Sequence, residues 1–244
     1  MARPIETANG VLIWEQLAKQ IRPLGPHWAP TGLIEIENTH NMAGGTVYPQ
    51  DVADDICDRA HEAGLPVHLD GARIFNAAVA LGKPVAEITR KFDSVMFCLS
   101  KGLGAPVGSL LVGSKSFIEQ ARSVRKALGG GMRQAGILAA AGLIALEKMP
   151  ARLHEDHANA RLLAEGLFGL PGIEIDPTRV QTNIVIFDVS GTGMSTSEFT
   201  HKLAEKNLLA GTADAQRVRF VTHMDVNREA CERALEAVKA VVGR

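Results

Sequence analysis

The sequence predicts an α/β protein, with a mostly parallel sheet flanked by helices followed by a small α+β domain. Three observations support this fold class. Apolar strand patterns alternate with helical patterns over the first 149 residues, which is typical of strand–helix–strand units. The order of predicted elements changes after Met149-Pro150, where helices and shorter strands follow in an α+β arrangement. Finally, 24 glycines and only 5% aromatic residues suit a compact protein with many tight turns.

The individual elements follow from apolar spacing and from turn residues. In the first part we expect strands at residues 33–37, 65–69, 94–99 and 107–112. The apolar run 94–99 is typical of a strand buried on both faces. Helical spacing covers residues 11–21, 50–63, roughly 72–91 with a break at Gly82-Lys-Pro84, 115–128 and 133–148. In the second part we expect helices at 151–168, 195–206 and 227–242, and strands at 182–189 and 218–221. The domains expected are therefore 1–149 and 150–244.

Charge and cysteine usage exclude several classes of protein. The 26 basic and 27 acidic residues give a net charge of −1, which argues against a nucleic-acid partner. No apolar run is long enough to span a bilayer, and the N-terminus has no signal-peptide pattern. The three widely spaced cysteines indicate reduced thiols, without a disulfide framework or a zinc ribbon. We therefore expect a cytoplasmic protein with no membrane or nucleic-acid partner.

An acid and an amine follow two successive predicted strands. Asp70 directly follows one strand, in His68-Leu-Asp-Gly-Ala-Arg73, and Lys101 follows the next strand, in Ser100-Lys-Gly-Leu-Gly104. A right-handed crossover brings the carboxyl ends of consecutive parallel strands to one edge of the sheet, where open α/β folds bind ligands. The pair suits pyridoxal phosphate (PLP), which needs a lysine amine for its aldehyde and a carboxylate for its pyridine nitrogen. Spacing alone leaves open that Asp70 caps a helix and that Lys101 is a surface lysine.

Five motifs resemble those of the threonine aldolases, which are PLP-dependent enzymes of the aspartate-aminotransferase-like fold, type I. The resemblance covers nearly the whole chain, in the family's order. It implies retro-aldol cleavage of threonine or allo-threonine to glycine and acetaldehyde, a lyase reaction of amino-acid metabolism. The motifs are Glu37-Asn-Thr-His-Asn41, His68-Leu-Asp-Gly-Ala-Arg-Ile-Phe-Asn76, Ser100-Lys-Gly-Leu-Gly-Ala-Pro-Val-Gly-Ser109, Gly129-Gly-Gly-Met-Arg-Gln134 and Val218-Arg-Phe-Val-Thr-His223.

The resemblance implies a role for each matching residue. Lys101 would be the Schiff-base lysine, and Asp70 would pair with the pyridine nitrogen. Arg73 and Arg219 would clamp the substrate carboxylate, a task for which the guanidinium fork is well suited. Arg133 would reach the cofactor phosphate from a neighbouring subunit, which implies a homo-oligomer, a dimer or tetramer with shared sites. The residues alone favour a helix-surface cation for Arg73 and a charge on an edge strand for Arg219.

Other residues carry weaker signals. His27, in Pro26-His-Trp28, falls where the family places an active-site histidine, which would accept the proton of the substrate hydroxyl; a surface histidine is the alternative. We interpret His40 as a residue that organises its loop. The glycines 129–131 precede a predicted helix and could bind an anion, or simply form a loop between two helices. His154 and His157 have metal-like spacing, but with Glu155 and Asp156 they are more typical of a solvated helix face.

The chain departs from the family pattern at its N-terminal side. We find no match to the N-terminal arm, to the Ser/Thr-Gly-Thr loop that holds the cofactor phosphate, or to the histidine that stacks on the cofactor ring. The first domain is therefore expected to be N-terminally incomplete, with an exposed sheet edge. Two alternatives to threonine cleavage stay open: an inactive, truncated fragment, and another PLP reaction on the same fold, such as β-elimination or racemisation.

Overall fold

The computed structural model describes residues 1–243, which divide into two compact units. Unit 1 comprises Met1–Thr39 and Tyr48–Pro150, and unit 2 comprises His40–Val47 together with the chain from Ala151 onward. The main division at Pro150 falls next to the boundary expected at Met149. We call the segment His40–Val47 the strap. The sequence placed this segment in the first domain, but it packs within unit 2.

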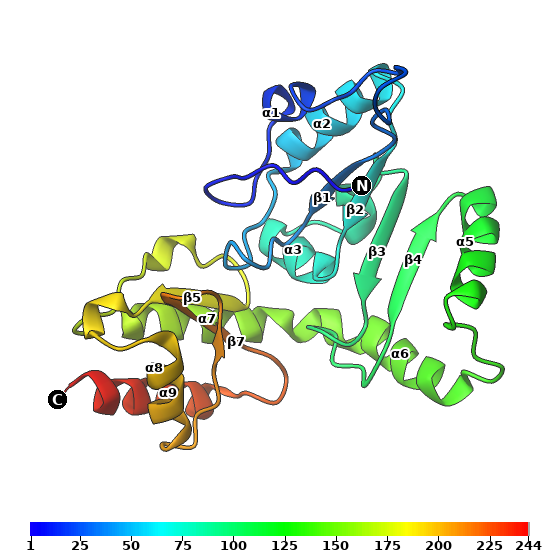
Figure 1. Cartoon of the computed structure of the whole chain (residues 1–244). Coiled ribbons are helices and arrows are strands. Elements are labelled where there is room, and N and C mark those ends of the chain that lie inside the picture. The colour runs from blue at the N-terminus through cyan, green and yellow to red at the C-terminus, as the bar shows by residue number, and fades with distance from the viewer. Residues whose placement is uncertain (244) are drawn as a thin grey trace. The chain divides into compact units, whose positions relative to one another are not determined.

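The sheet of unit 1 has four strands in the order β1-β2-β3-β4 (Figure 1). β1 to β3 are parallel, whereas β4 pairs antiparallel with β3, so the expected mostly parallel sheet is confirmed. β1 and β2 are in register from Ile34 opposite Val67 to Glu37 opposite Asp70. The strands are β1 (Ile34–Glu37), β2 (Val67–Asp70), β3 (Ser94–Cys98) and β4 (Ser109–Gly113).

Most helices of unit 1 lie where the apolar spacing predicted them. Buried residues of α2, such as Ile56 and Ala60, and the buried strand residues Val67 and Leu69 belong to the core of this unit. The chain leaves α2 through Gly64, whose φ of 71° is the left-handed conformation expected of a glycine cap. The helices are α1 (Trp14–Ala18), α2 (Gln50–Glu62), α3 (Ile74–Leu81), α4 (Val85–Ile88), α5 (Lys115–Ala127) and α6 (Gly136–Lys148).

Three expectations for unit 1 are wrong in detail. The helix predicted at 11–21 is only the five residues of α1, because the Tyr48 hydroxyl accepts from the Leu12 N–H at 2.6 Å and Ile13 is extended. The helix predicted from residue 133 begins at Gly136. β3 is buried only at its first two residues. β4 is an edge strand, and its Leu110, Leu111 and Val112 side chains are 39% to 51% exposed.

Unit 2 contains a three-stranded antiparallel sheet in the order β5-β7-β6. Its core joins buried residues of the two long strands to those of three helices; Phe187 makes edge-to-face contacts with Phe199 and Phe220 at 6.2 and 5.0 Å. The two-residue strand β6 has no apolar pattern, and the sequence missed it. The elements are η1 (Met149–Arg152), α7 (Leu153–Leu167), η2 (Pro177–Arg179), β5 (Ile184–Asp188), η3 (Ser190–Thr192), α8 (Thr196–Ala204), β6 (Gly211–Thr212), β7 (Arg217–Val221) and α9 (Arg228–Val242).

Cys57, Cys98 and Cys231 are free thiols in this structure. Burial raises the pKa of Cys57 to about 12 and that of Cys231 to about 11, so both thiols stay protonated at neutral pH. Within residues 1–243, no helix combines the length and the apolar character that crossing a membrane requires.

Candidate active site

Asp70 and Lys101 occupy the carboxyl edge of the sheet in unit 1. Asp70 is the last residue of β2, and Lys101 lies three residues beyond the end of β3. β2 and β3 are neighbouring parallel strands, with Asp70 in register with Met96. The structure therefore brings the carboxylate and the amine to the same edge of the sheet, as the strand pattern predicted.

Backbone contacts fix the turn that carries Asp70. The Asp70 carbonyl accepts from Asn38 N–H at 2.9 Å, and Asp70 Oδ1 accepts from Ala72 N–H at 3.0 Å. Gly71 donates its N–H to the Met96 carbonyl at 2.9 Å, and a Cβ at Gly71 would lie 2.9 Å from that same oxygen, so only glycine fits. Asp70 is half-buried, and within residues 1–243 its Oδ2 accepts no hydrogen bond. One carboxylate oxygen is thus available to a ligand.

Lys101 projects from a tight turn after β3. Its carbonyl accepts from Gly104 N–H at 2.9 Å, and Ala105 N–H closes the turn on the Leu99 carbonyl at 2.9 Å. Gly104 has a φ of 72°, which favours glycine at this position. The lysine is exposed, and in the described part of the chain its amine makes no hydrogen bond or ion pair. The Lys101 amine is therefore available to react with a ligand.

The other predicted residues of unit 1 differ in their setting. Arg73 is half-buried at the N-terminal boundary of α3, directly after the Asp70 turn. Arg133 is exposed in the segment between α5 and α6. His27 is exposed, its ring 6.4 Å from that of Trp28, and among the described residues it makes no hydrogen bond to Asp70 or Lys101. The structure thus groups Arg73 with the Asp70 turn, but shows no contact that groups Arg133 or His27 with it.

The glycines 129–131 do not form a helix N-terminus. Gly129 N–H bonds to the Lys126 carbonyl and Gly130 N–H to the Arg125 carbonyl, at 3.1 and 2.8 Å, so these glycines terminate α5. The next helix starts only at Gly136, after Ala135. These glycines therefore belong to the loop between two helices, and the free N–H groups of the next helix start lie further along the chain.

Arg219 belongs to unit 2, on the face of β7 opposite the helices. Its neighbours Val218 and Phe220 point into the core, whereas Arg219 is half-buried beside Ile186, its register partner on β5. Arg219 Nη1 donates to Asn41 Oδ1 of the strap at 3.0 Å. Its Nε–H is buried without a hydrogen-bond partner, and within residues 1–243 the guanidinium makes no ion pair. Asn41 lies in the motif Glu37-Asn-Thr-His-Asn41, but the sequence predicted no role for its side chain.

His40 organises the strap, as interpreted from the sequence. Its Nδ1 accepts from Ala43 N–H at 3.2 Å, and its backbone bonds to Thr46 and Gly45 at 2.9 Å each. These contacts hold the loop in a closed turn. The histidine thus stabilises the segment that carries Asn41.

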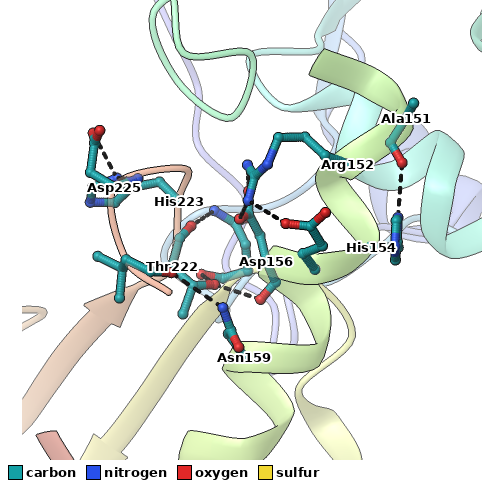
Figure 2. A network of polar contacts seen from close by, with 11 residues as sticks. Ala151, Arg152, His154, Asp156, Asn159, Thr222, His223 and Asp225 are labelled. Carbon is teal, nitrogen blue, oxygen red and sulfur yellow. Dashed lines mark hydrogen bonds and ion pairs between the residues drawn. The ribbon is translucent and has the colours of Figure 1, made fainter. Parts of the chain in front are cut away.

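A buried polar network lies at the start of α7 (Figure 2). Arg152 donates to both carboxylate oxygens of Asp156, at 2.8 and 3.2 Å. The Thr222 hydroxyl, just after β7, donates to the Asp156 carbonyl at 2.7 Å, and Asn159 Nδ2 donates to the Val226 carbonyl at 3.2 Å. Burial raises the pKa of Asp156 above its usual value, and Arg152 partly offsets this effect. The network joins α7 to the loop after β7.

The prediction of a solvated face for residues 154–157 is partly wrong. His154 and Glu155 are exposed, but Asp156 is fully buried and His157 is half-buried. Burial is the main reason that the pKa of His157 falls to about 4, with positive neighbours adding to the effect. The reason for the error is the helical period, which turns position 156 inward toward Arg152. No group of metal-binding side chains occurs in the described part of the chain.

The fold and its sheet edge define an α/β protein that presents a carboxylate and a free amine at the carboxyl ends of neighbouring parallel strands. The family model for beta-eliminating lyases matches residues 1–190. The chain belongs to this family, and the resemblance to threonine aldolases is confirmed by its curated relatives. It is 43% identical over 221 residues to low-specificity L-threonine aldolase 1 of Arabidopsis thaliana, covering 89% of this chain and 62% of that protein.

A second curated relative supports the same family, and two solved structures support the fold. The low specificity L-threonine aldolase of Escherichia coli O157:H7 is 44% identical over 228 residues, covering 93% of this chain and 66% of that protein. The chain thus spans less than two thirds of the length of these relatives. A threonine aldolase from Leishmania major superposes with a TM-score of 0.77 at 20% identity, over 98% of this chain and 69% of that one. An aspartate aminotransferase mutant from Thermus thermophilus superposes at 0.68 and 17% identity, over 95% and 64%. The expected aspartate-aminotransferase-like fold is confirmed.

Proposed function

We propose that this chain is a PLP-dependent aldehyde lyase that cleaves threonine or allo-threonine to glycine and acetaldehyde. The observation that carries the proposal is the placement of Asp70 at the end of β2 and of Lys101 just after β3, the neighbouring parallel strand, at one sheet edge. The aldolase names of the curated relatives supply the reaction. At about 44% identity over most of the chain, a shared chemistry is the simplest expectation.

The residues present fit the cofactor. When bound, PLP supplies an aldehyde that an amine can hold and a pyridine ring that withdraws electrons from the substrate α-carbon. The free amine of Lys101 would hold the aldehyde. The available Oδ2 of Asp70 would accept the pyridine N–H, and the hydrogen bond from Ala72 keeps this carboxylate in place. The missing side chain at Gly71 keeps the turn beside Asp70 close to β3.

Further roles complete the proposal. Arg73 and Arg219 would bind the substrate carboxylate; the buried, unpartnered Nε–H of Arg219 is a donor of the kind that a carboxylate satisfies. His27 would accept the proton of the substrate hydroxyl. Arg133 would bind the cofactor phosphate in a neighbouring subunit of a cytoplasmic homo-oligomer, a dimer or tetramer. The exposure of Arg133 is compatible with a role toward a second copy.

A second candidate reaction on the same site is β-elimination, which the family's description favours. It uses the same carboxylate and amine but expels the β-substituent instead of breaking the Cα–Cβ bond. Threonine and allo-threonine would then yield no glycine, and serine would be consumed. Product analysis with threonine, allo-threonine, serine and alanine therefore separates the two reactions, and alanine also reports racemisation.

The first test is cofactor attachment. The purified chain is mixed with PLP, its visible absorbance is recorded, and borohydride reduction followed by peptide mapping locates the modified lysine. We expect the adduct on Lys101 and its loss in Lys101→Ala. The control Lys83→Ala, which removes a partly exposed lysine paired with Glu87, should keep it. An adduct that persists in Lys101→Ala would refute the role of Lys101. A folded chain without any adduct would refute activity of this chain by itself.

A further inference from the structure

We infer that Asn41 is a positioning residue: it orients Arg219 for a substrate carboxylate while leaving the guanidinium charge unpaired. This inference rests on the proposed carboxylate-binding role of Arg219. It adds a residue for which the sequence suggested no role. Both residues lie in unit 2, so the contact belongs to one compact unit.

The first step is the chemistry of the contact. Asn41 Oδ1 is a neutral acceptor, and it takes one N–H of Arg219 at 3.0 Å. The acidic partners that saturate other arginines of unit 2, such as Asp156 beside Arg152 and Asp214 beside Arg217, have no counterpart at Arg219 within residues 1–243. An aspartate at position 41 would form an ion pair and compete with any carboxylate ligand. An amide fixes the side chain without that competition.

The second step is the donor that remains. Arg219 Nε–H is buried and has no hydrogen-bond partner. A buried donor without a partner is costly, and native structures satisfy nearly all of them. The Nη1 contact to Asn41 leaves Nε and Nη2, which lie on the same edge of the planar guanidinium and match the two oxygens of a carboxylate. The orphaned donor therefore points to a carboxylate ligand on that edge.

The third step is the rigidity of the strap. Val47 N–H donates to Gln181 Oε1 at 2.6 Å, and the Thr182 hydroxyl donates to the Gly45 carbonyl at 2.8 Å. Gly45 lies so close to the segment entering β5 that a Cβ there would overlap the Thr182 hydroxyl. These anchors, together with the internal turn around His40, hold Asn41 in place over β7. A fixed acceptor on a fixed loop restricts the rotamer of a long side chain, which lowers the entropy lost on binding.

The test compares Asn41→Asp, Asn41→Ala and wild type in the full chain loaded with PLP, with calorimetric titration of glycine and of ethylamine. Glycine carries the carboxylate that Arg219 would bind, and ethylamine lacks it. We expect Asn41→Asp to weaken glycine binding by on the order of tenfold or more, Asn41→Ala to weaken it less, and neither to change ethylamine binding. Asn207→Asp is the charge-matched control, because Asn207 is exposed in unit 2 at a φ of 60° that aspartate tolerates.

A second readout separates this inference from the proposed function. The Arg219 Nε–H signal, identified in the NMR spectrum of arginine-labelled protein by its loss in Arg219→Lys, should shift on glycine addition in wild type. In Asn41→Asp it should be shifted before glycine is added. A wild-type chain that binds glycine without involving Arg219 would refute the proposed role of that arginine, and the inference with it. Equal glycine affinity in wild type and Asn41→Asp, with Arg219 responding in both, would overturn the inference alone.

Discussion

Replacing Asp156 with alanine tests how much the buried pair with Arg152 stabilises unit 2. The carboxylate is fully buried and accepts two N–H groups of Arg152, whereas the Thr222 hydroxyl bonds to the Asp156 backbone and survives the substitution. Each hydrogen bond to a charged group contributes about 1.5–3 kcal/mol. Two effects reduce the loss. The alanine variant no longer has to bury the Asp156 charge, and Arg152, 22% exposed, still pairs with Glu155. We therefore expect a net loss of about 2 kcal/mol.

Asp156→Asn is the informative companion. The amide keeps an acceptor for Arg152 and removes the buried charge. Because burial raises the pKa of Asp156, the structure favours an uncharged group here, so this variant should lose about 1 kcal/mol or less at neutral pH. The control is Glu155→Ala, which removes the other carboxylate that Arg152 contacts, at 3.2 Å and 56% exposed. A surface pair of this kind contributes about 0–1 kcal/mol.

Native-state hydrogen exchange of the Thr222 amide, which donates to the Asn183 carbonyl at 3.0 Å, measures the loss locally. A loss of about 2 kcal/mol corresponds to roughly 30-fold faster exchange in Asp156→Ala. Exchange within about threefold of wild type, or no faster than in Glu155→Ala, would show that the pair does not hold α7 to the end of β7.

Two further outcomes follow from unit 2. Gly45→Ala should lower the unfolding free energy by about 2 kcal/mol or more, because position 45 has a φ of 76° and an added Cβ would overlap the Thr182 hydroxyl. The control Gly44→Ala should lower it by only about 1 kcal/mol, because position 44 has a φ of 82° but open space around it. Equal thermal midpoints of the two variants would contradict this reasoning. The pKa of His157 is about 4 in the folded chain and 6.5 in the unfolded chain. The buried neutral ring therefore does not lower the free energy of unfolding above pH 6.5, and this free energy falls by up to about 3 kcal/mol as the pH drops toward 4. Chemical denaturation at pH 7 and 4.5 should therefore show a smaller acid loss for His157→Gln than for wild type.

The sequence predicts most of the fold because its apolar periods and its glycine and proline breaks agree with each other. The strands ending at Asp70 and Cys98 and the helix capped by Gly64 needed only local patterns. Helix ends were less accurate, since tertiary contacts decide them. The hydroxyl of Tyr48, 36 residues away, takes the Leu12 N–H and keeps that segment out of α1.

The candidate site was predictable where strand order alone places residues together. Asp70 and Lys101 meet at one edge because consecutive parallel strands are neighbours. The setting of Arg219 was not predictable, because its contact with Asn41 joins residues 178 positions apart. No local pattern reports such a pairing. Asp156 was missed for a different reason, since its partner Arg152 is only four residues away: the helical period turns the carboxylate into the interior of unit 2.

The strap also has a consequence for how the chain reaches its native state. Its anchors connect residues 134, 137 and 178 positions apart. At about 5–20 residues per second, the ribosome releases the strap on the order of ten seconds or more before its partners just ahead of β5 and on β7 emerge. Such non-local contacts form slowly, because loop closure precedes any gain. Unit 2 therefore completes its assembly only after synthesis is nearly finished, and a separately expressed fragment beginning at Ala151 would lack one of its own packed segments.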